Sequence, residues 1–510
     1  MGVILGGATD WSQPTIACVP PAVDLDSFFS PLPAAIHFAA RSTRTRPNLF
    51  RHVPRSAKFI VGALLAAAIL HAPLVARAQN ATWLLTPGST NWNTAANWAP
   101  ATVPTGIATF GLSSVTSLTF SANASVGSIQ FLLGAPTYSF NLGTRQFTIG
   151  SNGLGTTIPG VISGAGGSIV KVGAGTLALS GANTYTGLTL ISAGVLQLGA
   201  GGFTGSIVGN VTNNSIFAIN RSNTYTFGGL IVGTGAFQQL GPGTTVFTGT
   251  STYAGGTLIS AGLLQIGAGG ITGSITGNVV NNAAFAINRS NAYTFAGVIS
   301  GTGTFEKLGT GVTTLTGAST YTGGTTITAG TLQIGAGGIT GSILGDVVNF
   351  GTFIINRSNA YTFAGAISGT GAFQKAGAGV TTLVGDSTYT GGTTITVGTL
   401  QIGAGGITGS ILGDVVNFGT FIINRSNAYT FAGAISGTGA FQKAGAGVTI
   451  LTGTSTYTGG TSITAGTLQI GAGGTTGSIV GNVTNTAIFA INRSDLFTFA
   501  GANPPRSYSS

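Results

Sequence analysis

The sequence is poor in the side chains that carry most covalent and metal chemistry. Its 510 residues include one cysteine and three histidines. Cys18, His37, His52 and His71 all precede residue 79, and no cysteine or histidine follows. Ser-His-Asp and Cys-His catalysis are therefore excluded beyond that point, because both need a histidine base. The same absence excludes zinc sites with nitrogen and sulfur ligands and a disulfide framework.

Charged residues are also scarce, at 5% of the chain, and the formal charge of +10 is misleading. Residues 1–78 hold seven basic and three acidic side chains, and the rest holds eleven basic and five acidic ones without a basic cluster. Nucleic-acid binding needs a concentrated stripe of lysine and arginine, so we do not expect it. No lysine follows a glycine, which excludes a G-x-x-x-x-G-K phosphate loop.

The acidic residues beyond residue 79 are too few for the usual carboxylate sites. They are Glu306, Asp346, Asp386, Asp414 and Asp495. Glycosidases need two carboxylates about 5 to 10 Å apart, and a calcium-binding solenoid needs aspartates at regular short spacing. The nearest approach to a charged site is Asp346 with Arg357, repeated as Asp414 with Arg425. The same slot holds Asn210, Asn278 and Asn482 in other repeats. We interpret it as a solvated turn and predict no catalytic, cofactor-binding or metal-binding residue.

Glycine, by contrast, is abundant, with 87 residues and no G-x-y triplet period that would indicate collagen. Threonine, serine, asparagine and branched apolar residues make up most of the remainder. Runs such as 325–335 alternate apolar and polar residues between glycines, which predicts short strands with Ile327, Leu332 and Ile334 pointing inward. We predict an all-β protein with almost no helix outside the signal peptide.

From about Lys171 onward the chain has a strict 68-residue period, which is the step from Tyr185 to Tyr253. Five copies of a Thr-Tyr-x-Gly patch contain Tyr185, Tyr253, Tyr321, Tyr389 and Tyr457, and five copies of Ile-Asn-Arg-Ser contain Arg221, Arg289, Arg357, Arg425 and Arg493. Residues 331–381 and 399–449 are identical. A fixed period indicates one unit stacked on copies of itself. Three β-helix coils of roughly 22 to 23 residues would fill each repeat.

The repeated Asn-Arg-Ser has two interpretations. In the structural one, asparagine caps a turn and arginine pairs with a carbonyl or lies over a tyrosine. In the functional one, five arginines in line grip an acidic polysaccharide. We favour the structural interpretation.

The amino-terminal region resembles a secretory leader. Basic residues precede the apolar run 59–70, and Ala76-Arg77-Ala78 is a small-x-small cleavage site, so we expect a signal peptide over 51–78. Residues 1–50 fit poorly ahead of it, and we expect a non-globular extension, with the true start further along the chain. Residues 79–165, which contain Trp83, Trp92 and Trp98, are predicted to form an amino-terminal β segment that caps the repeat array. The tryptophans are expected to fill the core rather than stack on sugars.

One part of the repeat is similar to a known family. The pattern Gly173-Ala-Gly-Thr-Leu through Val-Leu-Gln-Leu-Gly199 resembles the autotransporter-associated β-strand repeat, a passenger motif of type V secretion proteins, and close versions recur at 241–267, 309–335, 377–403 and 445–471. The resemblance covers roughly residues 79–502 and implies a right-handed parallel β-helix (β-solenoid), with the repeat array over 166–502, exported to a Gram-negative cell surface. It also implies a role in passenger folding and translocation and no catalysis.

The end of the chain departs from that family. Passengers are followed by an outer-membrane translocation barrel of alternating strands, and this sequence has none. The repeat pattern stops at residue 502, and an off-register tail follows over 503–510. We expect the reading frame to be truncated or shifted there.

The sequence therefore predicts a secreted or surface-displayed structural or adhesive β-helix, without cofactor, that meets a surface polysaccharide or a host surface. Two alternatives stay open. A β-helical enzyme acting on polysaccharides would need clustered carboxylates in one groove. An ice- or surface-binding solenoid would need aligned threonines in successive coils.

Overall fold

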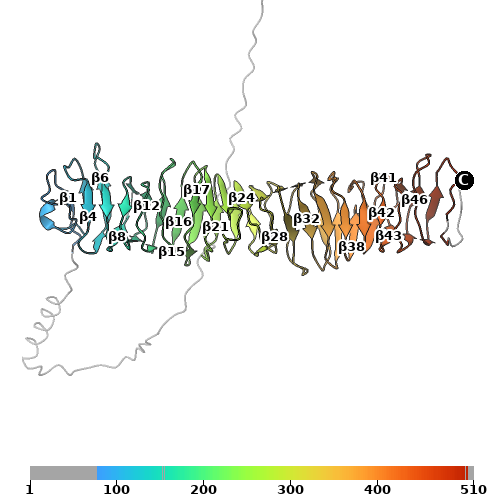
Figure 1. The fold of residues 1–510 in the computed structure, drawn as a ribbon, viewed down its shortest axis with the longest axis horizontal. Helices are drawn as coiled ribbons and strands as arrows, with labels where there is room; N and C mark the ends of the chain where they lie inside the picture. Colours follow the sequence, from blue (N-terminus) through green and yellow to red (C-terminus); the bar gives the residue numbers. More distant parts are fainter. Residues whose placement is uncertain (1–76, 152, 154, 500, 503–510) are drawn as a thin grey trace, which may run out of the picture. The chain divides into compact units, whose positions relative to one another are not determined.

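The computed structural model describes residues 77–151, 153, 155–499 and 501–502. The predicted extension (1–50), the tail (503–510) and all but the last two residues of the predicted signal peptide (51–78) lie outside the described residues. The described residues belong to one compact unit, and its strands follow one another as short rungs of a long stack (Figure 1). Within the described ranges, no helix is long and apolar enough to cross a membrane.

The second, third and fourth repeats each build eight short strands with the same bounds relative to the start of the repeat. In the second repeat they are β19 (Ala236–Gln239), β20 (Thr244–Phe247), β21 (Thr257–Ile259), β22 (Leu263–Ile266), β23 (Val279–Asn281), β24 (Ala284–Ile287), β25 (Tyr293–Phe295) and β26 (Ile299–Ser300). Strands β27–β34 and β35–β42 have the equivalent bounds one and two repeats later, and β43–β48 cover the first six positions of the last repeat. Strands β11 (Ser168–Val172) to β18 (Ile231–Val232) form the first repeat.

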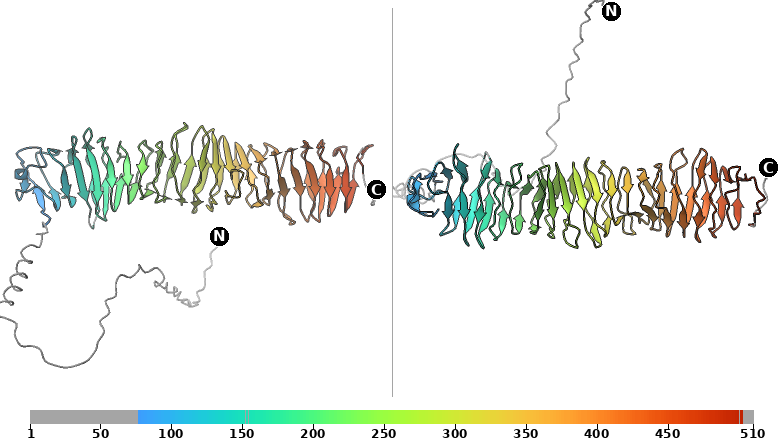
Figure 2. Two further views of the ribbon diagram at one scale, coloured as in Figure 1. Left: turned by 90° about the horizontal axis from the view of Figure 1, so that it is seen from below. Right: turned by 45° about the horizontal axis from the view of Figure 1, so that its top comes forward.

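The strands pair in parallel with strands about one coil away. Thr244 pairs with Leu263, and Thr257 pairs with Val279, so the chain completes one coil between the two members of each pair. Between β19 and β21, which are neighbours in one sheet, lie β20 of a second sheet and Thr250, which bridges to Ser274. Each coil thus has three strand positions, on three faces. The stack comprises about 19 coils and confirms the predicted all-β parallel β-helix (Figure 2).

One 68-residue repeat does not contain a whole number of three-faced coils. A complete repeat has eight strands and one isolated bridge that joins two further positions, ten strand positions in all, which is three coils and one further face. The prediction of about three coils per repeat is confirmed. The extra position shifts the next repeat by one face. Strands β17 (Tyr225–Phe227), β25, β33 (Tyr361–Phe363) and β41 (Tyr429–Phe431) are equivalent, yet each begins a different sheet. Equivalent residues therefore move to the next face with every repeat.

Apolar side chains alternate with polar ones along each strand and fill the interior. Ile327, Leu332 and Ile334 have no exposed surface, as predicted. Glycines allow the close approach of stacked turns. Gly330, for example, has a φ of 68° at a turn, a conformation that residues with a Cβ rarely adopt.

The first coils contain the three tryptophans. Trp83, Trp92 and Trp98 are buried, and the rings of Trp83 and Trp92 each lie 4.9 Å from Trp98 in edge-to-face contacts. Their role in core filling is confirmed. The first strands are β1 (Ala81–Trp83), β2 (Trp98–Ala99), β3 (Ile107–Phe110), β4 (Ser117–Thr119), β5 (Ala124–Val126), β6 (Ser128–Phe131), β7 (Ser139–Asn141), β8 (Gln146–Gly150), β9 (Thr156–Ile158) and β10 (Ile162–Ser163), with one 3-10 turn, η1 (Ala95–Asn97). Only the pair β1–β2 is antiparallel among the described strands. The division of this region from the repeat array at residue 165 stays a prediction.

Candidate functional site

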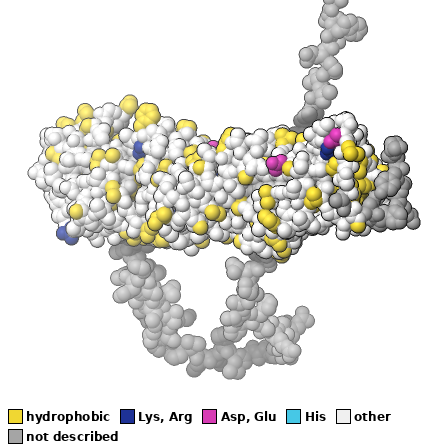
Figure 3. Space-filling model, turned by 45° about the vertical axis from the view of Figure 1, so that its right-hand side comes forward, with side chains coloured by type: hydrophobic (Ala, Val, Ile, Leu, Met, Phe, Trp, Pro, Cys, Tyr) yellow, Lys and Arg dark blue, Asp and Glu magenta, His cyan; other side chains and the backbone are white. Residues whose placement is uncertain are grey.

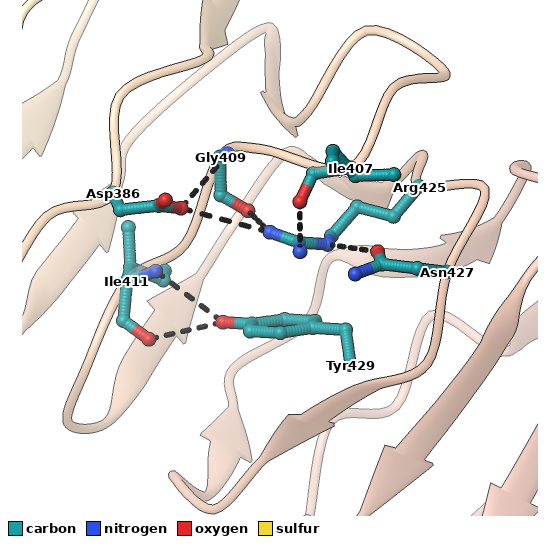
Figure 4. Close-up of polar contacts among 7 residues, drawn as sticks. All are labelled: Asp386, Ile407, Gly409, Ile411, Arg425, Asn427 and Tyr429. Carbon is teal, nitrogen blue, oxygen red and sulfur yellow. Dashed lines mark hydrogen bonds and ion pairs between the residues drawn. The ribbon is translucent and has the colours of Figure 1, made fainter.

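The arginine that recurs in each repeat makes both hydrogen bonds and a cation–π contact within the solenoid (Figure 4). Arg425 donates hydrogen bonds from its two terminal nitrogens to the carbonyl oxygens of Gly409 and Ile407, and from Nε to Oδ1 of Asn427 at 3.1 Å. Its guanidinium carbon lies 4.9 Å from the ring centre of Tyr429, a cation–π contact. The side chain is only 7% exposed. The arginine thus holds the glycine-rich loop that precedes it in the chain.

The other repeats have the same arrangement, which we call the arginine latch. Arg221, Arg289 and Arg357 are 8 to 9% exposed and bind the equivalent two carbonyls, asparagine and tyrosine. Arg493 is more exposed, lies over Phe497 and pairs with Asp495. The structural interpretation of the arginine, by carbonyl pairing and aromatic contact, is confirmed. The predicted capping by its neighbouring asparagine is wrong, because that amide makes no hydrogen bond to the described part of the chain.

The alternative of five arginines gripping an acidic polysaccharide is contradicted on two grounds. Four of the arginines are buried, and all three guanidinium nitrogens of each donate to groups within the chain. Equivalent positions also move to the next face with each repeat, so the arginines are not in line. A linear anionic ligand on one face would meet only every third latch.

The slot that holds either aspartate or asparagine also has a structural role. Asp346 Oδ1 accepts a hydrogen bond from the Ala366 amide at 2.8 Å, one coil further along the chain. Asn278 Oδ1 accepts the equivalent bond from Val298 at 2.9 Å. Asp346 and Arg357 form no ion pair in the described structure, which has only two, Arg425–Asp386 at 3.7 Å and Arg493–Asp495 at 2.6 Å. The interpretation as a turn rather than a charged site is confirmed.

The repeated tyrosine of the Thr-Tyr-x-Gly patch lies in the core. Tyr321 is fully buried, and its hydroxyl shares a hydrogen bond of 2.6 Å with the hydroxyl of Thr325. Burial raises the pKa of Tyr321 far above its ordinary value, since the ionised form would lie in an apolar interior. The patch is therefore a core contact that recurs in each repeat rather than a binding surface.

The sequence reasoning missed a second buried cation. Lys171, Lys307, Lys375 and Lys443 have no exposed surface and no acidic partner, and Gln239 fills the same slot in the second repeat. The Lys307 amine donates to the carbonyl oxygens of Gly309 and of Ala329, the latter at 3.2 Å on the next coil. Gln239 donates to the Gly241 carbonyl at 2.9 Å. A basic or amide side chain that recurs once in every repeat, two positions before a glycine, was the signal available in the sequence.

The buried lysines should make stability depend on pH. Burial lowers the pKa of Lys307 to about 8, against 10.5 for an unburied lysine. Between these values the unfolded chain binds more protons, so the free energy of unfolding should rise with pH. We predict that Lys307→Gln is at least as stable as the parent near pH 7, because it removes a buried charge, and that its advantage shrinks near pH 10. Urea unfolding of both proteins at the two pH values tests this, and an advantage that grows with pH contradicts it.

The buried cations change the electrostatic character of the surface. Eight lysine and arginine side chains of the solenoid are buried, whereas Asp346, Asp386, Asp414 and Asp495 are exposed. Figure 3 shows a surface of mostly neutral side chains and backbone, with scattered apolar side chains and few charges. Shallow grooves beside two equivalent turns are lined by Thr390, Gly392 and Asp414 in one repeat and by their counterparts Thr458, Gly460 and Asn482 in the next. This surface favours neutral partners over anionic ones.

The outward row of one sheet face counts against the ice-binding alternative. Along one face, consecutive coils present Gln333, Ile354, Gln374, Thr394 and Val416, which are direct neighbours in the parallel register. A flat array of aligned threonines is therefore absent from this face. Within the described residues there is also no group of three or more potential metal-ligating side chains.

Comparison with known proteins identifies the repeated unit. The sequence profile of the passenger-associated-transport repeat matches residues 169–198, 237–266, 305–334, 373–402 and 441–470. The chain carries five passenger-associated-transport repeats. Each match includes the buried lysine or glutamine slot and the tyrosine–threonine pair, and ends with the strand before the loop that the arginine latch holds. The predicted passenger motif is confirmed.

A curated relative agrees with this assignment. The adhesin BmaC autotransporter of Brucella suis biovar 1 (strain 1330) is 34% identical to the chain over 172 residues, which cover 30% of this chain and 5% of that protein. The chain thus matches a small part of the relative's length. No solved structure matches the passenger-repeat chain. The repeats thus match the passenger-associated-transport repeat, and one stretch of the chain is similar to part of an autotransporter adhesin.

Proposed function

We propose that the protein is an exported, non-catalytic passenger rod that adheres to a surface at the outside of the cell. The observation that carries the proposal is the set of five passenger-associated-transport repeats, together with the adhesin relative. The solenoid's repeated polar groups support a structural role, because the arginine latch, the buried lysine and the tyrosine–threonine pair all bind groups within the chain. What remains at the surface is mostly uncharged, with a few exposed acidic side chains.

The partner expected from this surface is a neutral polysaccharide or an uncharged region of a host surface. Because most cations are buried, adhesion should not rely on long-range attraction, and we expect it to change less than about twofold when salt is raised from low to high ionic strength. Adhesion of cells displaying the protein, measured across a salt series, tests this. A steep loss with salt would contradict a neutral partner.

Cell fractionation tests the proposed export. In the bacterium that makes the protein, we expect it in the outer-membrane or extracellular fraction and accessible to added protease. Retention in the cytoplasm would contradict the proposal. The double variant Asp346→Asn/Asp414→Asn provides a control for hidden catalysis, because asparagine fills this slot naturally in other repeats. Adhesion and location should be unchanged in it.

Removal of one repeat tests whether length or a unique site matters. A deletion of residues 399–466 joins Gly398 to Thr467 and restores a native Gly-Thr junction. Because a repeat contains one face more than three coils, the deletion also moves all later residues to another face. If adhesion depends on rod length and surface chemistry, it should fall only moderately. Complete loss with the protein still displayed would instead indicate a unique site.

A further inference from the structure

The three residues of each Asn-Arg-Ser segment directly follow a strand, such as β24 (Ala284–Ile287), and differ in exposure. The arginine points inward to form the latch, and its two neighbours point toward solvent. In the second repeat, Asn288 is half-exposed and Ser290 is exposed, whereas Arg289 is buried. The equivalent asparagines are Asn220, Asn356, Asn424 and Asn492, of which the first three are half-exposed and the last is exposed.

The amides of these five asparagines are unbonded and reach solvent. None makes a side-chain hydrogen bond to the described residues, and none is among the buried polar atoms without a partner. Other asparagines of the second repeat are used internally. Asn281 donates to the Thr304 carbonyl at 2.7 Å, Asn278 accepts from Val298 at 2.9 Å, and Asn291 accepts from Arg289 at 3.1 Å.

The sequence around the open asparagine is an acceptor sequence for N-linked sugars. Asn-x-Ser/Thr is the motif that glycosyltransferases recognise, and in exported proteins it lies on the surface. All five open asparagines have serine two positions later. The buried asparagine slot has that pattern only at Asn213. The other repeats hold alanine or glycine at the position two residues on, namely Ala283, Gly351, Gly419 and Ala487.

The neighbourhood leaves room for a bulky substituent. A Cβ added at Gly269 would lie 3.8 Å from Asn288 Oδ1, and one added at the adjacent Gly270 would meet no atom within 4 Å. The loop beside the amide is thus glycine-rich and open. Arg289 is buried whereas Asn288 is half-exposed, so a sugar on the Asn288 amide would extend away from the latch.

We propose that Asn220, Asn288, Asn356, Asn424 and Asn492 are attachment sites for N-linked sugars, supplied by a separate glycosyltransferase from an activated glycosyl phosphate donor. The amide nitrogen Nδ2 forms a bond to the anomeric carbon of the sugar as the bond from that carbon to the phosphate oxygen breaks. The phosphate group leaves with the bonding electron pair, and the amide proton passes to a base of the transferase. Because equivalent positions move from face to face, the sugars would emerge on all three faces of the rod.

Mass spectrometry of the protein from the cells that naturally make it tests the proposal. Asn288 is the site of choice, because Asn356 and Asn424 lie in identical stretches whose peptides cannot be told apart. A protease that spares arginine should release a peptide carrying a sugar mass on Asn288. Asn282 is a matched internal control, since it is exposed and unbonded but is followed by Ala283 and Ala284 instead of a motif serine.

Three variants separate this modification from others. The ratio of modified to unmodified Asn288 peptide should fall at least about tenfold in Asn288→Gln and in Ser290→Ala, and should persist in Ser290→Thr, which keeps the motif. A sugar mass that persists in Asn288→Gln would place the sugar on a hydroxyl and overturn the proposal. Unmodified peptides at all five asparagines would also overturn it. Neither outcome bears on the proposed adhesion, which is measured separately.

Discussion

Replacing Arg357 by alanine is expected to lower the free energy of local unfolding around the latch by about 3 to 5 kcal/mol. Hydrogen bonds to a charged group contribute about 1.5 to 3 kcal/mol each. Removal of the guanidinium leaves the carbonyls of Gly341 and Ile339 without their donor and removes the contact 4.8 Å above Tyr361. Hydrogen exchange should accelerate at the amides of the loop around residues 335–343, and protease should cleave there.

The effect should be local, because stability in a solenoid is a sum of contacts between neighbouring coils. Arg145→Ala is the matched control, since Arg145 is exposed and makes no side-chain hydrogen bond in the described structure. It should change stability by less than about 0.5 kcal/mol. Unchanged exchange at the loop in Arg357→Ala would mean that the latch does not hold it. Arg357→Lys should only partly restore protection, because one amine cannot reproduce the guanidinium fork.

The second large effect is expected at Gly377, which stacks directly on the latch arginine of the coil below. A Cβ at Gly377 would overlap the backbone carbonyl and amide of Arg357, and backbone atoms cannot move aside as a flexible side chain can. Parallel strands lie only about 4.8 Å apart, so Gly377→Ala must push two coils apart. We expect a loss of more than about 3 kcal/mol, by analogy with overpacking of a dense core.

Gly338→Ala is the control in the preceding repeat. Nothing lies within 4 Å of the Cβ that it would add, and its backbone is not in the left-handed region. Its effect on stability should lie within about 0.5 kcal/mol, or be slightly favourable because alanine restricts the unfolded chain. Thermal unfolding of the two variants, measured side by side, decides the matter. Equal melting temperatures would show that the stacked coils can separate at little cost.

The alternation at Ile327, Leu332 and Ile334 was sufficient to predict inward-facing strands, and the 68-residue period predicted stacked coils. Alternation can be read from the sequence because it follows from the pleat of a single strand. The period can be read because it is a spacing along the chain. The roles of Arg357 and Asp346 were also interpreted correctly as structural. For Asp346 the clue was the asparagine at the equivalent position of other repeats. The buried Lys307 was missed, because lysine is ordinarily a surface residue.

The position of each repeat around the rod could not be predicted from the period. The length of the period is compatible with three coils, and only the pairing of strands revealed the tenth strand position that moves β25 to a different face from β17. This extra face eliminated the row of arginines that the sequence allowed. It also distributes the open asparagines over all three faces.

The sequence by itself determined stacked β coils without histidine or cysteine chemistry beyond residue 79, because strand alternation, glycine turns and composition can be read residue by residue. Its resemblance to a known motif added the passenger repeats. Only the tertiary structure decided which charged side chains are buried and which carbonyl groups bind them. The carbonyls that bind Arg357 belong to Gly341 and Ile339 in the preceding loop, and the second carbonyl that binds Lys307 belongs to Ala329 on the following coil. Such partners are brought together only when one coil stacks on the next. That stacking gives a formally basic chain buried cations and a mostly uncharged surface with a few exposed aspartates.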